Sequence, residues 1–223
     1  MPSKQDIVSQ IVSIFLKLVA KDPLSVVDFA FDILQRIPLF NKLPGMYEVI
    51  DYEVTLHIRD KKGATAVYTK QQHIRFLQDN IIAFQDKAWG DGEIFADYKC
   101  SPGVEVDRYR DGHRYNILIS LRETKHRDDE LTFHVERTIK NGFTATEEAF
   151  QTDIDHRTRK MTLNVVFPVT RLPTSVKVVE QNTGRSQALT GKHRQILPDG
   201  THKYTWKMVN PRLYESYIID WVW

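Results

Sequence analysis

The sequence predicts an α+β protein dominated by β structure: an antiparallel β-sandwich or flattened barrel of about ten strands, preceded by an N-terminal two-helix hairpin. Two observations predict this class. Hydrophobic residues recur with helical spacing up to residue 37, and with a period of two from residue 52 onward. Short turns containing Gly, Pro and Asp separate the later segments, with no helical segment between them. We therefore divide the chain into residues 1–44, the hairpin and its linker, and residues 45–223, the antiparallel β domain.

Two strongly apolar helices are expected in the first part. The first covers about residues 4–21, and the second runs from Pro23 to about residue 37, with Asp22 as its N-cap. The first apolar run, at roughly 14 residues and interrupted by Lys17, is shorter than the ~20 needed to cross a bilayer. We therefore expect both helices to belong to the mature fold.

Each helix carries an apolar arc that is wider than one packing face requires. Burying both arcs needs more surface than the hairpin supplies, so we expect a protein partner, a homo-oligomer or contact with a membrane. The candidate interface residues on these arcs are Ile11, Phe15, Leu18, Phe29 and Ile33.

The β pattern is clearest in residues 52–59, where every second side chain is apolar. Turns at residues 60–63 and 198–201 each predict a hairpin. The strands at residues 115–123 and 131–139 are also expected to pair as a hairpin, and residues 78–114 are expected to be less regular. The ten expected strands are residues 52–59, 64–77, 115–123, 131–139, 149–155, 161–168, 175–181, 193–197, 202–208 and 214–223.

Composition argues against several classes of function. The formal net charge is only +2, so there is no strong signal for nucleic-acid binding. Cys100 is the sole cysteine, which excludes an intramolecular disulfide and favours a cytoplasmic location. None of the eight histidines has metal-ligand spacing, and no serine nucleophile motif occurs. We therefore predict no catalytic residues, no metal and no cofactor, and we lean toward a protein that is not an enzyme.

Two segments of the β domain are candidates for binding a ligand. In Trp89-Gly-Asp-Gly92, the glycines would let the backbone approach a partner closely, although a tight turn with Trp89 in the core is the simpler interpretation. Residues 107–114 place arginines beside aromatic and glycine residues, which suits a phosphate or carboxylate, but nearby acidic groups also fit an ordinary charged turn. The candidate ligand-binding residues are Trp89, Asp91, Arg110, His113 and Arg114.

The C-terminal strand is rich in aromatic residues. Tyr217, Trp221 and Trp223 share one face, which would suit either a ligand groove or the core of the sandwich. We expect the core, with the C-terminus built into a sheet.

Three functions compete on these observations. The leading hypothesis is a non-enzymatic interaction, effector or adaptor protein, such as a module of a bacterial multi-component system, acting through its helical hairpin. The alternative is a binder or sensor of a small anionic ligand, a nucleotide or metabolite, that uses loops of the β domain. A third hypothesis is a hydrolase built from Asp91, Asp111 and His113.

Overall fold

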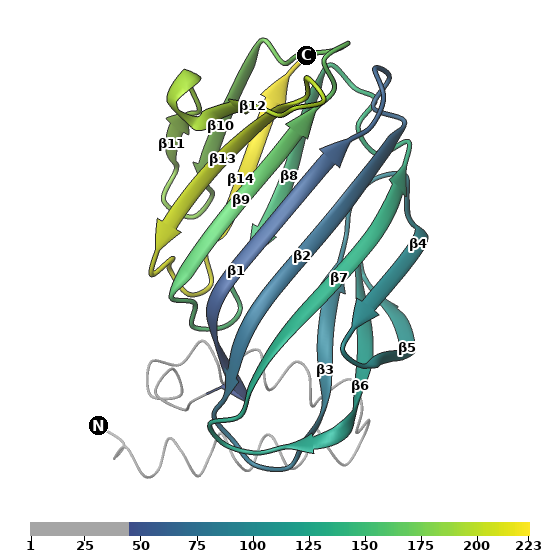
Figure 1. Cartoon of the computed structure of the whole chain (residues 1–223), viewed down its shortest axis with the longest axis vertical. Helices are drawn as coiled ribbons and strands as arrows, with labels where there is room; N and C mark the ends of the chain where they lie inside the picture. The colour runs from purple at the N-terminus through teal and green to yellow at the C-terminus, as the bar shows by residue number, and fades with distance from the viewer. Residues whose placement is uncertain (1–44) are drawn as a thin grey trace, which may run out of the picture. The chain divides into compact units, whose positions relative to one another are not determined.

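Fourteen β-strands and one short 3₁₀ helix account for the regular structure in the computed structural model, which describes residues 45–223 (Figure 1). The elements are β1 (Tyr47–Ile58), β2 (Thr65–Phe76), β3 (Ile81–Ala88), β4 (Glu93–Ser101), β5 (Val104–Asp111), β6 (Arg114–Lys125), β7 (Glu130–Lys140), β8 (Glu147–Asp153), β9 (Lys160–Phe167), β10 (Ser175–Glu180), β11 (Arg185–Ala188), η2 (Gly191–His193), β12 (Arg194–Ile196), β13 (His202–Val209) and β14 (Ser216–Val222).

The strands form three open sheets. The seven-stranded sheet has the order β12-β13-β9-β1-β2-β7-β4, the four-stranded sheet β11-β10-β14-β8, and the three-stranded sheet β3-β6-β5. All neighbouring strands are antiparallel except β1 and β9, which pair in parallel with Tyr52 opposite Met161. Figure 1 shows the seven-stranded sheet as one layer, with the two smaller sheets behind it.

This architecture corrects the predicted fold class. The described residues contain no α-helix and are nearly all β, so the α+β class is wrong. No sheet closes on itself, because each order given above ends in two unpaired edge strands, so the flattened barrel is also wrong. The predicted two-helix hairpin falls on residues 1–44, which lie outside the described residues.

Several strands were not expected. The segment predicted to be irregular contains β3, β4 and β5, and β11 is also additional. In β3 the inward side chains are Phe84, Asp86 and Ala88, so a buried aspartate interrupts the apolar alternation. The side chains of β5 are mostly exposed, so the strand carries little hydrophobic pattern.

The connections were predicted correctly in two of three cases. The turn at residues 60–63 joins β1 to β2, and Asp60 accepts hydrogen bonds there from the backbone N–H groups of Lys62 and Thr65. The turn at residues 198–201 joins β12 to β13. The predicted hairpin of β6 with β7 is wrong: β6 pairs with β3 and β5, whereas β7 pairs with β2 and β4. The connection between them therefore passes from one layer to the other.

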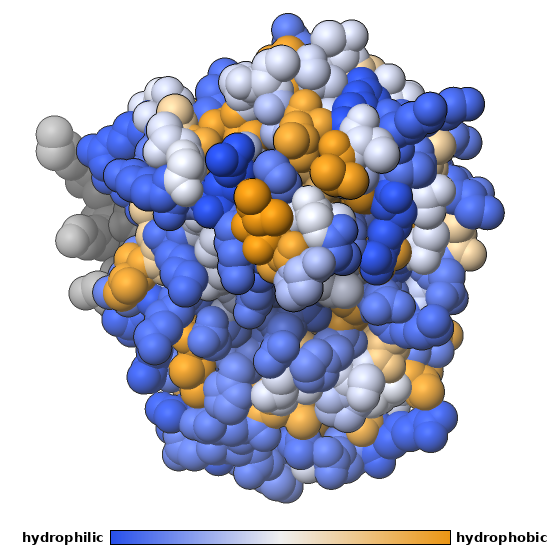
Figure 2. All heavy atoms as spheres, turned by 45° about the horizontal axis from the view of Figure 1, so that its top comes forward, coloured by the Kyte–Doolittle hydropathy of each residue, from blue (hydrophilic) through white to orange (hydrophobic). Residues whose placement is uncertain are grey.

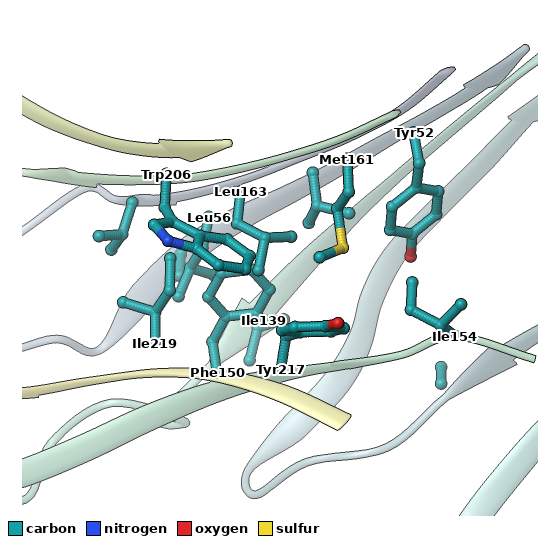
Figure 3. Packing of buried hydrophobic residues seen from close by; sticks show 14 of the residues in the cluster. Tyr52, Leu56, Ile139, Phe150, Ile154, Met161, Leu163, Trp206, Tyr217 and Ile219 are labelled. Carbon is teal, nitrogen blue, oxygen red and sulfur yellow. The ribbon is translucent and has the colours of Figure 1, made fainter. Parts of the chain in front are cut away.

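The core lies between the seven-stranded sheet and the two smaller sheets. Figure 3 shows Met161 and Trp206 extending from the first of these sheets toward Phe150, Tyr217 and Ile219 of the four-stranded sheet. Burial of each such side chain contributes roughly 1.5–3 kcal/mol. This packing fixes the separation of the layers in which the candidate site lies.

The C-terminal strand is part of this core, as predicted. β14 lies between β10 and β8, and its Tyr217 and Trp221 side chains are buried. Trp223 is partly buried and packs at an angle against Phe167, with ring centroids 5.4 Å apart. These aromatic residues therefore stabilise the packing between the sheets.

The exposed hydrophobic residues come from separate elements. The most exposed are Val209, Ile82, Ile196, Val169 and Val106. On the face shown in Figure 2, orange hydrophobic residues form several groups interrupted by polar and charged ones. Residues 45–223 include no helix with the length and hydropathy needed to cross a membrane.

Candidate functional site

A cavity of about 220 Å³ lies between the seven-stranded sheet and strands β8 and β14 of the four-stranded sheet. Much of its wall is apolar. This part of the wall consists of Leu56, Ile94, Ile139, Phe143, Phe150 and Ile218. Three of these side chains, Leu56, Ile139 and Phe150, lie in the layer between the sheets that Figure 3 shows. We call this space the Arg137 cavity, after the cation in its wall.

Arg137 reaches the cavity because it occupies an inward position of β7. The inward side chains of this strand are Phe133, Val135, Arg137 and Ile139, so an arginine stands in an otherwise apolar series. Its side chain is only 8% exposed. Its Nε and Nη1 atoms are buried and have no hydrogen-bond partner among the described residues. Leaving a buried cation without a partner costs several kcal/mol, so this arrangement is unusual in a structural residue.

Tyr68 holds the Arg137 guanidinium in place. The two residues lie opposite each other in the pairing of β2 with β7. The guanidinium carbon is 4.3 Å from the centroid of the Tyr68 ring, a cation–π contact. Because the ring covers one face of the guanidinium, a ligand would have to approach its N–H groups in the plane of the group.

The second buried cation near this layer already has a partner. Lys70 of β2 forms a buried ion pair with Asp86 of β3, and the Tyr98 hydroxyl donates to the other Asp86 oxygen at 3.1 Å. Burial, assisted by the charge of Asp86, raises the pKa of Tyr98 above its ordinary value, so this hydroxyl stays protonated. Asp86 therefore balances Lys70, whereas Arg137 forms no ion pair with any of residues 45–223.

The turn between β3 and β4 forms part of the cavity wall through Trp89, Gly90 and Asp91. Gly92 has φ +72°, and a Cβ atom there would overlap the carbonyl oxygen of Lys140 at the end of β7. The glycine thus permits the close approach that brings this turn onto the cavity. Gly90 and Asp91 are exposed, so we call residues 89–92 the mouth turn.

Arg114 of β6 connects the mouth turn to the four-stranded sheet. The guanidinium carbon of Arg114 lies 4.7 Å from the centroid of the Trp89 ring, and its Nη2 donates to Asp153 at 2.7 Å. Asp153 also accepts hydrogen bonds from Gln151 and Ser216, both at 2.7 Å. Because Gln151 itself lines the cavity, one polar network fixes two parts of its wall.

The structure brings together some of the predicted ligand-binding residues. Trp89 and Asp91 line the cavity, and Arg114 contacts Trp89. Arg110 and His113 are exposed near the β5–β6 turn and are not among the described lining residues. The Arg110 Nε atom donates instead to the carbonyl oxygen of Gly112 at 2.9 Å.

The other candidates are placed as follows. Within residues 45–223, no hydrogen bond or ion pair joins the hydrolase candidates Asp91, Asp111 and His113. The predicted interface residues all lie outside the described part of the chain: Ile11, Phe15, Leu18, Phe29 and Ile33. The structure shows no cluster of three or more His, Cys, Asp or Glu side chains placed as metal ligands within its described residues.

Arg137 was missed by the sequence analysis, although a signal was present. It occupies the apolar phase of a strand that is otherwise regular, at the position where the alternation requires a hydrophobic residue. An arginine in the buried phase of a strand indicates either an ion pair or a ligand site. Comparison with known proteins does not help to decide between an ion pair and a ligand site, because no family model and no curated protein matches the sequence.

Proposed function

We propose that residues 45–223 bind a small organic anion in the Arg137 cavity, and that binding rather than catalysis is the activity of this domain. One observation carries the proposal: a buried arginine in a cavity wall, two of whose nitrogen atoms have no hydrogen-bond partner within residues 45–223. A bound anion would supply the missing charge, and its oxygens would accept hydrogen bonds from guanidinium N–H groups that face the cavity. Apolar walls with a few convergent polar groups are typical of small-molecule sites.

This function is the anionic-ligand alternative of the sequence analysis, with a different anchoring residue. It rests on described residues, whereas the interaction hypothesis rests on residues 1–44. Partner binding or self-association through that segment stays a prediction. The two functions are compatible, because a ligand-binding domain can be joined to an interaction segment.

The proposal is tested by screening the full chain for small anions that raise its melting temperature, followed by calorimetric titration. The screen contains carboxylates, sulfonates and phosphate esters. Arg137→Met should weaken binding roughly 10- to 100-fold, since a charge-assisted hydrogen bond contributes about 1.5–3 kcal/mol. The control is Arg110→Met, which changes an exposed arginine that does not line the cavity and should leave affinity unchanged.

Stability without ligand provides a second readout. If Arg137 serves a ligand, Arg137→Met should not lower the free energy of unfolding of the unliganded chain, because it removes an uncompensated buried charge. A loss of more than about 2 kcal/mol, together with no anion that stabilises the wild type, would identify Arg137 as a structural residue and refute the proposal.

A further inference from the structure

Four properties of the Arg137 cavity restrict the class of its ligand: the charge of its wall, the charge at its mouth, its lining and its volume. From these we infer that the ligand is a monocarboxylate of about ten non-hydrogen atoms in all, with an aromatic or branched apolar body, and not a nucleotide or another phosphorylated metabolite. This inference rests on the function proposed above and names the substrate class of the same site.

The buried positive charge of the cavity wall is balanced by a ligand with one negative charge. Arg137 is the cation that lines the cavity, and Lys70 is neutralised by its ion pair with Asp86. A monoanion balances Arg137, whereas a phosphate monoester carries nearly two charges at neutral pH and would leave one buried without compensation. The in-plane N–H groups of a guanidinium also match the two oxygens of a carboxylate.

The mouth is acidic, which also disfavours a dianion. Asp91 lines the cavity at the exposed mouth turn. A polyphosphate that extended from Arg137 toward the opening would meet the Asp91 carboxylate.

The lining and the volume determine the rest of the molecule. Six aliphatic or phenyl side chains surround the space, so the part of the ligand beyond its carboxylate is apolar. A cavity of ~150 Å³ accommodates benzene, and drug-sized ligands occupy ~300 Å³ or more. At about 220 Å³ the Arg137 cavity fits a phenyl ring with a carboxylate, whereas a base, a sugar and a phosphate together would extend out of its mouth.

The test is calorimetric titration of the full chain with matched probes. Benzoate and phenylacetate represent the inferred class, and phenylacetamide has nearly the shape of phenylacetate without its charge. Phenyl phosphate adds charge, AMP adds size, and acetate lacks the apolar body. We expect benzoate or phenylacetate to bind at least tenfold more tightly than each of the last four probes, and to lose at least tenfold in affinity in Arg137→Met. Circular dichroism would confirm that this variant is folded.

A second variant tests the contribution of the mouth. Asp91→Asn removes the exposed carboxylate from a turn in which asparagine is well tolerated. It should improve the affinity for phenyl phosphate severalfold while changing that for phenylacetate less than twofold. Equal changes for both probes would contradict the role given to Asp91.

The outcomes separate the inference from the proposed function. If phenyl phosphate or AMP binds more tightly than the carboxylates, and Arg137→Met abolishes that binding, the ligand class is wrong and the proposed function stands. If phenylacetamide binds as tightly as phenylacetate, charge recognition by Arg137 is refuted. If no anion in the wider screen binds the wild type, the proposed function itself fails.

Discussion

Arg114 and Trp89 are stacked at the mouth of the cavity, with the guanidinium carbon 4.7 Å from the ring centroid. The same guanidinium is paired with Asp153 at the end of β8. Arg114 therefore holds the mouth turn, between β3 and β4, by its contact with Trp89, and its ion pair with Asp153 joins the three-stranded sheet to the four-stranded sheet. The shape of the cavity depends on this contact between layers as well as on the residues that line it.

Arg114→Ala should lower the free energy of unfolding by about 1–2 kcal/mol, between the values for exposed and for buried ion pairs. The Arg114 side chain is one-third exposed, but that of Asp153 is only 11% exposed and would lose its counter-charge. Urea unfolding measures the effect, with Arg110→Ala on the same hairpin as the control. Equal losses in the two variants would show that the ion pair contributes nothing specific.

Asp86→Asn should lower the free energy of unfolding by about 3 kcal/mol, because it leaves Lys70 as an unpaired buried cation. The double variant Lys70→Met with Asp86→Leu removes both charges and should recover most of the loss. Denaturant midpoints of the two variants and the wild type make the comparison. The expectation fails if the double variant is the less stable of the two.

Gly92→Ala should destabilise the domain clearly more than Gly112→Ala does. Both glycines have positive φ, +72° and +58°, so each alanine incurs a backbone penalty of about 1–2 kcal/mol. Only at Gly92 would the added Cβ meet protein, since nothing lies within 4 Å of the position at Gly112. The difference between the melting temperatures of the two variants measures the destabilisation caused by the steric overlap alone. Similar melting temperatures would rule out a close approach at the mouth turn.

The stability of the domain should decrease as the pH falls from about 6.5 to 4. Burial lowers the pKa of His156 to about 4, and its ring packs on Tyr47 with centroids 4.1 Å apart. The unfolded chain binds a proton at this histidine below pH 6.5, whereas the folded chain does not until about pH 4. The histidine thus leaves stability unchanged above pH 6.5 and lowers it through this window, by up to about 3 kcal/mol.

Urea unfolding at pH 7.5, 6 and 5 tests this dependence, with His156→Gln as the comparison. Burial also lowers the pKa of His57, so the wild type and the variant share that contribution. The loss of stability between pH 7.5 and 5 should be smaller in the variant. Parallel curves would exclude His156 as the source.

The sequence predicts the strands whose two faces differ in polarity. In β1, Val54, Leu56 and Ile58 are buried as the alternation indicates. It does not predict β3, because Asp86 occupies an inward position, or β5, whose side chains are mostly exposed and whose pattern therefore lacks contrast. Local patterning reports the contrast between the faces of a strand, and it fails where that contrast is small or interrupted.

The candidate site was predictable only in part. The glycines around Asp91 mark a close backbone approach, and the structure provides one at Lys140. The cavity itself depends on the packing of β7, in the seven-stranded sheet, against β8 and β14, in the four-stranded sheet. No local pattern encodes such a juxtaposition, so the importance of Arg137 becomes visible only when the layers are assembled.

The parallel pairing of β1 with β9 has a consequence for synthesis of the chain. The Asn164 amide of β9 donates to Glu53 of β1, 111 residues earlier, and to Thr55, 109 residues earlier. At translation rates of about 5–20 residues per second, one edge of β1 therefore stays unpaired for roughly 5–20 seconds until β9 has been synthesised. Throughout that interval the nascent chain exposes unpaired backbone groups of this edge to neighbouring nascent chains on the same message, where they could pair incorrectly.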